Sequence, residues 1–208
     1  VLNNKSFFGT EIQRLYKTIL KKDFITGKGS VFKNDIQTEY INCLLEKSGP
    51  FPNLKVVWDC GNGATGEVIE ALVKKLPGEH KVLFSKIDGS FPNHHPDPTV
   101  ENNLKHIKEA MEIEKADLGI SFDGDGDRLG ILSKNKELIP GDILTTFLSG
   151  SILKTRQNRK IIFDIKSSQT AFELVKKQNG QPVVSKTGHS LIKSKIKETG
   201  APLAGEMS

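Results

Sequence analysis

Three aspartates alternate with two glycines in Asp123-Gly-Asp-Gly-Asp-Arg128, directly after a short apolar run that ends at Phe122. Alternate residues of an extended segment point to the same side, so the three carboxylates can converge, and glycine lets the backbone bend between them. Crowded carboxylates repel one another unless a hard cation lies among them, and oxygen ligands without Cys or His favour magnesium or calcium over zinc. We therefore predict a divalent metal site at Asp123, Asp125 and Asp127.

Two other interpretations of this loop are a calcium-binding EF-hand and a simple polar turn. An EF-hand needs Gly at the sixth position and Glu at the twelfth, where this chain has Arg128 and Lys134. A turn at the end of a strand is often rich in Asp and Gly, but three alternating aspartates exceed what a turn requires. Arg128 also indicates catalysis, because a guanidinium beside carboxylates can bind a phosphate that shares the cation.

A second glycine-rich segment, Gly61-Asn-Gly-Ala-Thr-Gly66, matches the G-x-G-x-x-G pattern of dinucleotide-binding sites. It follows a predicted strand, and Asp88 stands about twenty residues further on, where a ribose-binding acid would be expected. A Rossmann-type dinucleotide-binding module that uses Gly61, Gly63, Gly66 and Asp88 is therefore an alternative function. We favour the structural interpretation, a tight strand-to-helix turn, because nothing else in the chain indicates hydride transfer.

Weaker signals lie elsewhere along the chain. Lys166 follows a predicted strand at the end where open α/β sheets bind ligands. The segment Lys186-Thr-Gly-His189 precedes a predicted helix, whose N-terminus could bind a phosphate. The segment Pro92–Pro98 contains His94 and His95, but adjacent side chains of an extended segment diverge, so we predict a rigid loop rather than a metal site.

The spacing of apolar residues predicts alternating strands and helices. Strands are expected at 54–58, 81–87, 117–122, 160–164, 182–185 and 201–204, and helices at 67–76, 100–113, 142–153, 168–178 and 190–198. Gly180 and Gly200 are expected to end the helices before them. This alternation predicts an α/β fold class with two consecutive small α/β domains, whose mixed, mainly parallel sheets are sandwiched by helices. The domain boundary is expected near residues 136–140.

The composition, 36% hydrophobic and 26% charged residues, is typical of a soluble globular protein. No apolar run is long enough for a membrane helix, and no signal peptide is evident. The two cysteines are too few for a disulfide framework, which favours a reducing cytoplasm. The net charge of +5 suits an anionic ligand, but the lysines are scattered and the aromatics few, so nucleic acid is not an expected partner.

Taken together, these segments closely resemble the α-D-phosphohexomutase family, specifically its bacterial phosphomannomutase/phosphoglucomutase branch. The resemblance covers essentially the whole chain and is carried by Asp59-Cys-Gly-Asn-Gly-Ala64, Pro92-Asn-His-His-Pro-Asp-Pro98, Asp123-Gly-Asp-Gly-Asp-Arg128, Lys186-Thr-Gly-His-Ser190 and Gly205-Glu-Met-Ser208. It implies a four-domain enzyme. Residues 1–34 would then be the remnant of the phosphoserine domain, 35–137 the metal-loop domain and 138–208 a truncated sugar-binding domain.

The resemblance also implies roles for individual residues. Magnesium would bind Asp123, Asp125 and Asp127, and Arg128 would lie near the reacting phosphoryl group. Residues that would contact the substrate are Lys166, Thr187, Gly188, His189, Glu206, Met207 and Ser208. Catalytic roles fall to Arg128, Lys166 and His189, of which the last two could assist proton transfer.

The implied reaction is reversible transfer of phosphate between carbon 1 and carbon 6 of mannose or glucose. It would run through a phosphoserine and a bisphosphate intermediate, with glucose 1,6-bisphosphate as activator, in the cytoplasm. The expected partners are hexose phosphates and the missing domains 1 and 4 of the same enzyme, with no nucleic acid and no membrane. Because the serine loop and the domain that grips the second phosphate have no counterpart here, we expect this chain alone to be inactive.

Overall fold

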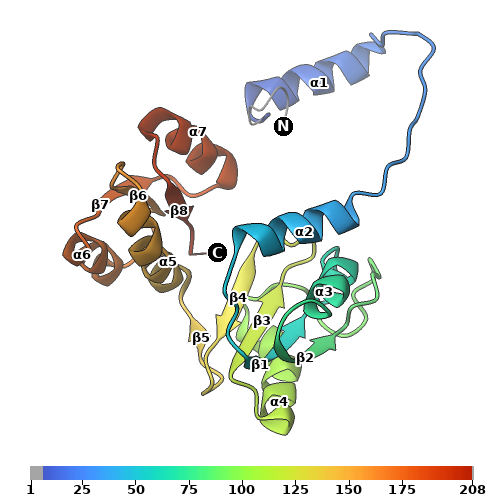
Figure 1. Cartoon of the computed structure of the whole chain (residues 1–208). Coiled ribbons are helices and arrows are strands. Elements are labelled where there is room, and N and C mark those ends of the chain that lie inside the picture. Colours follow the sequence, from blue (N-terminus) through green and yellow to red (C-terminus); the bar gives the residue numbers. More distant parts are fainter. Residues whose placement is uncertain (1–6, 208) are drawn as a thin grey trace. The chain divides into compact units, whose positions relative to one another are not determined.

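The computed structural model describes residues 7–207 and contains two α/β units (Figure 1). One unit comprises Lys33–Ile139, and the other comprises Pro140–Met207 together with N-terminal residues up to Phe32. Helix α1 (Thr10–Lys21) lies in that N-terminal segment and buries none of its residues. Within residues 7–207, no helix combines the length and apolar character needed to cross a membrane.

The unit Lys33–Ile139 is built on a five-stranded sheet with the order β2-β1-β3-β4-β5. Its strands are β1 (Leu54–Asp59), β2 (Gly78–Leu83), β3 (Leu118–Phe122), β4 (Leu129–Leu132) and β5 (Leu138–Ile139). Strand β1 pairs in parallel with β2 and β3, whereas β3–β4 and β4–β5 are antiparallel pairs. The two short antiparallel strands were not predicted from the sequence.

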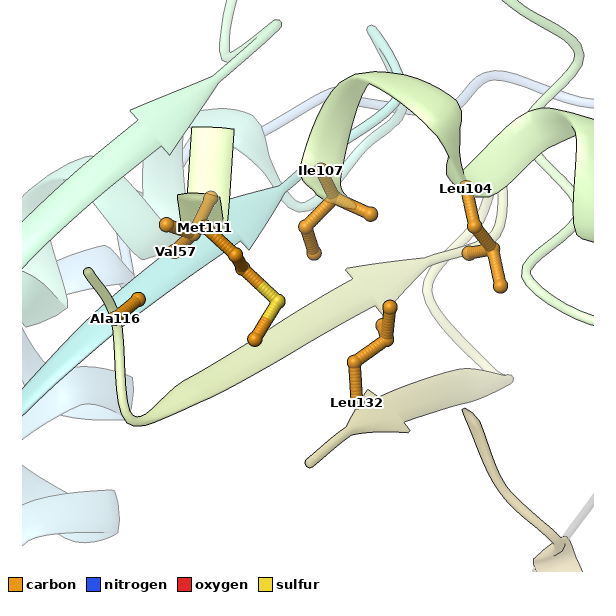
Figure 2. Packing of buried hydrophobic residues seen from close by; sticks show 6 residues of the cluster. All are labelled: Val57, Leu104, Ile107, Met111, Ala116 and Leu132. Carbon is orange, nitrogen blue, oxygen red and sulfur yellow. The ribbon is translucent and has the colours of Figure 1, made fainter. Parts of the chain in front are cut away.

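Helices cover both faces of this sheet, and they are α2 (Gln37–Lys47), α3 (Gly66–Val73) and α4 (Lys105–Glu114), with a 3₁₀ turn η1 (Glu101–Leu104) before α4. Alternate residues of β1 face opposite sides. Val57 packs with Ile107 and Met111 of α4 (Figure 2), whereas Val56 belongs to a second core with Ile69 of α3. The strand period of two and the helical spacing of the α4 residues therefore give two cores, one on each face.

The second unit has a three-stranded parallel sheet with the order β7-β6-β8. Its strands are β6 (Lys160–Asp164), β7 (Gln181–Ser185) and β8 (Leu203–Gly205), and its helices are α5 (Gly141–Thr155), α6 (Gln169–Lys177) and α7 (His189–Thr199). Ile161 and Phe163 pack against α5 and α6, whereas Ile162 packs against α7. Both units thus have mixed or parallel sheets between helices, and the predicted α/β fold class is confirmed.

Candidate functional site

The aspartate loop begins at the carboxyl end of β3. One carboxylate oxygen from each of Asp123, Asp125 and Asp127 lies within 4.8 Å of the others, and no other group of three such ligands occurs among residues 7–207. Asp123 is buried, whereas Asp125 and Asp127 are exposed. Three clustered carboxylate oxygens with an open side fit a hard divalent cation, which takes its remaining ligands from water or phosphate.

Arg128 is fixed beside these carboxylates. Its Nε donates to Oδ2 of Asp123 at 2.8 Å, and its backbone N–H donates to Oδ1 at 3.0 Å. The guanidinium also lies 3.8 Å from Asp127 and, through Nη1, 3.7 Å from Asp97. The Arg128 side chain remains 39% exposed, so a positive charge beside the carboxylates stays accessible to an anion.

The carboxylates differ in their electrostatic environment. Burial would raise the pKa of Asp123, but the hydrogen bonds from the backbone and side chain of Arg128 outweigh it, and this pKa lies below its usual range. Burial and the negative charges of Asp125 and Asp123 together raise the pKa of Asp127. A divalent cation among the three groups would relieve the repulsion that raises this pKa.

The glycine turn after β1 packs directly against the aspartate loop, because parallel β1 and β3 end at the same edge of the sheet. The N–H of Ala64 donates to the carbonyl of Gly124 at 2.9 Å. A Cβ on Gly63 would lie 2.6 Å from that same carbonyl oxygen, and one on Gly126 would lie 2.4 Å from a methyl carbon of Thr65. The two loops therefore need glycines at their contact.

The dinucleotide alternative draws no support from this geometry. A Cβ on Gly66 would lie 1.8 Å from the carbonyl oxygen of Ser85, so close packing within the protein explains this glycine. The Oδ1 of Asp88 accepts hydrogen bonds from the N–H and hydroxyl of Ser90 and closes a local turn. The interpretation of the glycines as a tight strand-to-helix turn thus accounts for their positions.

The segment Pro92–Pro98 contacts both loops. Pro96 approaches Gly61 and Gly124, and a carboxylate oxygen of Asp97 faces Arg128. His94 contacts Asp59 and, among residues 7–207, belongs to no group of three potential metal ligands. The contacts of Asp97 and Asp59 were not predicted from the sequence.

The second unit gathers its own set of polar groups at one edge of its sheet, because β6, β7 and β8 are parallel and end together. The Nζ of Lys166 lies 3.7 Å from Oδ2 of Asp164, to which the hydroxyl of Thr187 donates at 3.1 Å. The N–H of Gly188 donates to Oε1 of Glu206 at 2.6 Å.

The remaining residues that were predicted to contact the substrate are His189, Met207 and Ser208. His189 begins α7 and thus stands directly after Gly188 at this edge. Met207 follows Glu206, and its backbone approaches Gly141 at the start of α5. Ser208 lies outside the described residues. The structure therefore brings Lys166, Thr187, Gly188, His189 and Glu206 to one edge of the second sheet.

Comparison with known proteins finds a family match for each of the two α/β parts of the chain. The family model described as phosphoglucomutase/phosphomannomutase, alpha/beta/alpha domain II, matches residues 35–136, and the one for domain III matches residues 140–208. The phosphomannomutase/phosphoglucomutase of Pseudomonas aeruginosa is 40% identical over 208 residues, which are 100% of this chain and 45% of that protein. The phosphoglucomutase of Neisseria meningitidis serogroup A is 37% identical, with 100% and 46% covered.

Solved structures agree with these matches. A phosphoglucomutase/phosphomannomutase family protein from Burkholderia thailandensis superposes with a TM-score of 0.95 and 40% identity, over 100% of this chain and 45% of that one. An Aspergillus fumigatus N-acetylphosphoglucosamine mutase in complex with glucose 1,6-bisphosphate shares the fold, with a TM-score of 0.60 and 19% identity over 82% and 35% of the two chains. The present chain thus spans about 45% of the length of the relatives at 40% identity.

Proposed function

Because the chain belongs to the phosphoglucomutase/phosphomannomutase family, we propose that it forms the metal-binding and sugar-binding parts of a phosphohexomutase. Such an enzyme would interconvert hexose 1-phosphate and hexose 6-phosphate, with mannose or glucose as the sugar, through a phosphoserine and a bisphosphate intermediate. The observation that carries this proposal is the cluster of three carboxylate oxygens within 4.8 Å of one another, beside an accessible guanidinium.

In this proposal Asp123, Asp125 and Asp127 hold Mg²⁺. The ion would supply positive charge to neutralise the transferring phosphoryl group. Arg128 adds a second positive charge at the same place, and its planar guanidinium can donate two hydrogen bonds to one phosphoryl group. Because Arg128 is already held by Asp123, little reorganisation is needed when the substrate binds.

The second unit would bind the sugar. Glu206, Met207 and Ser208 would contact its hydroxyls, with Glu206 held by the N–H of Gly188. Lys166, Thr187, Gly188 and His189 would line the substrate cleft, and Lys166 or His189 would assist proton transfer. The gathering of five of these residues at the carboxyl edge of one parallel sheet supports this assignment, since open α/β sheets bind ligands there.

The whole enzyme would act on hexose phosphates in the cytoplasm, with glucose 1,6-bisphosphate as activator. The fungal mutase that shares the fold is in complex with this bisphosphate, which supports binding of the bisphosphate by the whole enzyme. The 208 residues would lack mutase activity alone, since they span only about 45% of the length of their relatives. Robust conversion of glucose 1-phosphate by the purified chain would refute this expectation.

The test of the metal site is Mn²⁺ binding by the purified 208-residue chain, followed by electron paramagnetic resonance. We expect one saturable site that Mg²⁺ competes away and that Asp125→Asn abolishes. The matched control is Asp88→Asn, a partly exposed aspartate of the same unit, whose turn hydrogen bonds lie outside the cluster. Binding that survives Asp125→Asn would contradict the metal assignment, and no saturable binding would contradict a preformed site in this chain.

A further inference from the structure

Both ring nitrogens of His94 face hydrogen-bond acceptors. Nε2 lies 3.1 and 3.0 Å from the two carboxylate oxygens of Asp59, and Nδ1 lies 3.0 Å from the carbonyl oxygen of His95. A neutral imidazole has one N–H and can satisfy only one of these acceptors, whereas an imidazolium donates to both. The surroundings therefore match a positively charged His94 that is paired with a carboxylate.

This pair is removed from water. The side chains of His94 and Asp59 are 7% and 0% exposed. Phe84 packs edge-on against the His94 ring, with the ring centroids 5.5 Å apart. The ring of His106 from α4 stacks on the His94 ring, with the centroids 5.8 Å apart. Removal of one partner of such a pair leaves an uncompensated buried polar or charged group, which destabilises the folded state.

Two titratable side chains contact the His94 ring, and three others lie close to it or to Asp59 in sequence. Asp59 faces it from β1, with Cys60 next in the chain, and His106 faces it from α4. His95 and Asp97 lie on its own loop. Among these groups, Asp59 carries the hydrogen bonds to the ring, and His106 meets it face to face.

The loop that carries His94 also packs against the aspartate loop. Pro96 lies against Gly61 and Gly124, where added Cβ atoms would approach its side chain at 3.0 and 3.4 Å. Two residues before Pro96, His94 is anchored to Asp59, and one residue after it, Asp97 lies 3.7 Å from the Arg128 guanidinium. A short segment thus connects a buried charged pair to both the backbone of the aspartate loop and its arginine.

We infer that the His94–Asp59 ion pair positions the aspartate loop, by holding Pro96 against Gly124 and Asp97 beside Arg128. His94 and Asp59 are positioning residues, since neither side chain contacts the carboxylate cluster or a reacting group. The inference rests on the proposed function only in treating Asp123–Asp127 as the metal loop. In support, the hydrogen bond to Asp59 raises the pKa of His94, although burial opposes this effect.

The test is a pH titration of the ¹⁵N-labelled 208-residue chain by nuclear magnetic resonance. We expect both His94 ring nitrogens to be protonated at mildly acidic pH and to lose one proton at a midpoint above the ordinary value. The Arg128 Nε–H and Gly124 amide resonances should follow the same midpoint. A neutral His94 throughout, or arginine and glycine resonances that ignore its titration, would overturn the inference, and neither result requires a variant to fold.

Two histidine variants sharpen this test. His94→Gln should abolish the shared midpoint in the Arg128 and Gly124 resonances. His80→Gln is the control in the same unit, because His80 bonds to Trp58 and Pro77, away from the aspartate loop, and it should leave the midpoint unchanged. A shared midpoint that persists in His94→Gln would show that another group is responsible.

Mn²⁺ binding separates this inference from the proposed function. His94→Gln should weaken Mn²⁺ binding roughly tenfold, as is usual when a group that orients metal ligands is lost. Unchanged affinity in the folded variant would count against the positioning role. Absence of Mn²⁺ binding by the unmodified chain would contradict the metal site itself, while the resonance titration would still decide the role of His94.

Discussion

The Nε of Arg128 donates a hydrogen bond of 2.8 Å to Oδ2 of Asp123, and the backbone N–H of Arg128 donates to the other carboxylate oxygen at 3.0 Å. The N–H of Asp123 in turn donates to the carbonyl of Arg128 at 3.2 Å. The loop is thereby closed at both ends, and Asp123 is held in place. Only the two exposed aspartates, Asp125 and Asp127, remain to adjust around a cation.

The first prediction concerns this closure. Arg128→Lys keeps the positive charge but removes the fixed Nε–H, so Asp123 should lose its orientation and Mn²⁺ binding should weaken. A charge-assisted hydrogen bond contributes about 1.5–3 kcal/mol, and partial exposure favours the lower end, roughly a tenfold loss of affinity. Lys134→Arg, a cation exchange at an exposed site of the same unit, is the control and should have no effect. Equal affinities of both variants and the unmodified chain would contradict the prediction.

The second prediction concerns the core between β1 and α4. Ile107 packs there with Val57 and Met111 (Figure 2) and is fully buried, whereas Ile113 on the same helix is 78% exposed. Ile107→Ala should lower the free energy of unfolding by about 2–5 kcal/mol, because it removes buried methyl groups and leaves a cavity. Ile113→Ala should change it by less than about 0.5 kcal/mol. Urea unfolding followed by Trp58 fluorescence measures the free energy of unfolding of both variants. Similar losses in the two would contradict the burial of Ile107 in this core.

The sequence predicted most of the strands and helices, because apolar residues repeat with the period of each element. Strand β2 is an exception, since residues 81–87 were predicted and Gly78–Leu83 are observed. Its pairing with β1 sets the register, with Leu54 opposite Gly78 and Asp59 opposite Leu83, and the positive φ of Phe84 ends it. Pairing with β1 thus sets the two ends of β2, and the local pattern of apolar residues does not reveal them.

The short strands β4 and β5 and the end of helix α6 were not predicted correctly from the apolar pattern, for other reasons. Strands β4 and β5 have only four and two residues, too few for a visible alternation. Helix α6 ends at Lys177, and Asn179 adopts the left-handed conformation two residues later, one residue before Gly180, which was predicted to end the helix. A Cβ on Gly180 would lie 2.6 Å from a side-chain carbon of Val175, so close packing, rather than a positive φ, requires this glycine.

The clustering of Asp123, Asp125 and Asp127 followed from their spacing alone, because three alternate residues of one loop need no distant partner. The contact of His94 with Asp59 joins residues 35 positions apart, and no local periodicity encodes it. It depends on how the loop after β2 folds back over the end of β1. Such contacts become visible only in three dimensions.

The third prediction concerns the contact between the glycine turn and the aspartate loop. A Cβ on Gly63 would lie 2.6 Å from the carbonyl oxygen of Gly124, so Gly63→Ala must displace the aspartate loop. We expect a loss of about 1–3 kcal/mol in the free energy of unfolding, as for other overpacked sites, together with weaker Mn²⁺ binding. Gly89→Ala is the control, since a Cβ there meets no atom within 4 Å. Full Mn²⁺ affinity in Gly63→Ala would show that the two loops are not coupled.

The fourth prediction compares two glycines of the second unit. Gly150 lies within helix α5, and a Cβ there would make only ordinary contacts of 3.7–3.8 Å with Gln178, so Gly150→Ala should stabilise by about 0.5–1 kcal/mol through helix propensity. Gly200 ends α7 with φ of 66°, which an L-residue adopts at a cost. Gly200→Ala should therefore destabilise by about 1 kcal/mol. Thermal unfolding measures the stability of both variants. Stability changes of the same sign would contradict the different roles given to Gly150 and Gly200.

The fifth prediction concerns the pH dependence that the His94–Asp59 pair gives to stability. The pKa of His94 is raised in the folded state by its hydrogen bond to Asp59, so the folded protein holds this proton more tightly than the unfolded chain does. The stabilisation is therefore fully present below the unfolded value, about 6.5, and is lost as the pH rises through the higher folded value.

This dependence can be isolated by subtracting the unfolding free energy of His94→Gln from that of the unmodified chain at each pH. The difference should be largest near pH 5.5 and should fall toward higher pH, because glutamine does not titrate. The same subtraction with His80→Gln, a histidine that bonds to Trp58 in the same unit, corrects for loss of a histidine in general. A His94 difference that rises with pH would mean that the imidazole is buried in its neutral form, and Asp59 would then hold it as a hydrogen-bond acceptor rather than as a counter-ion.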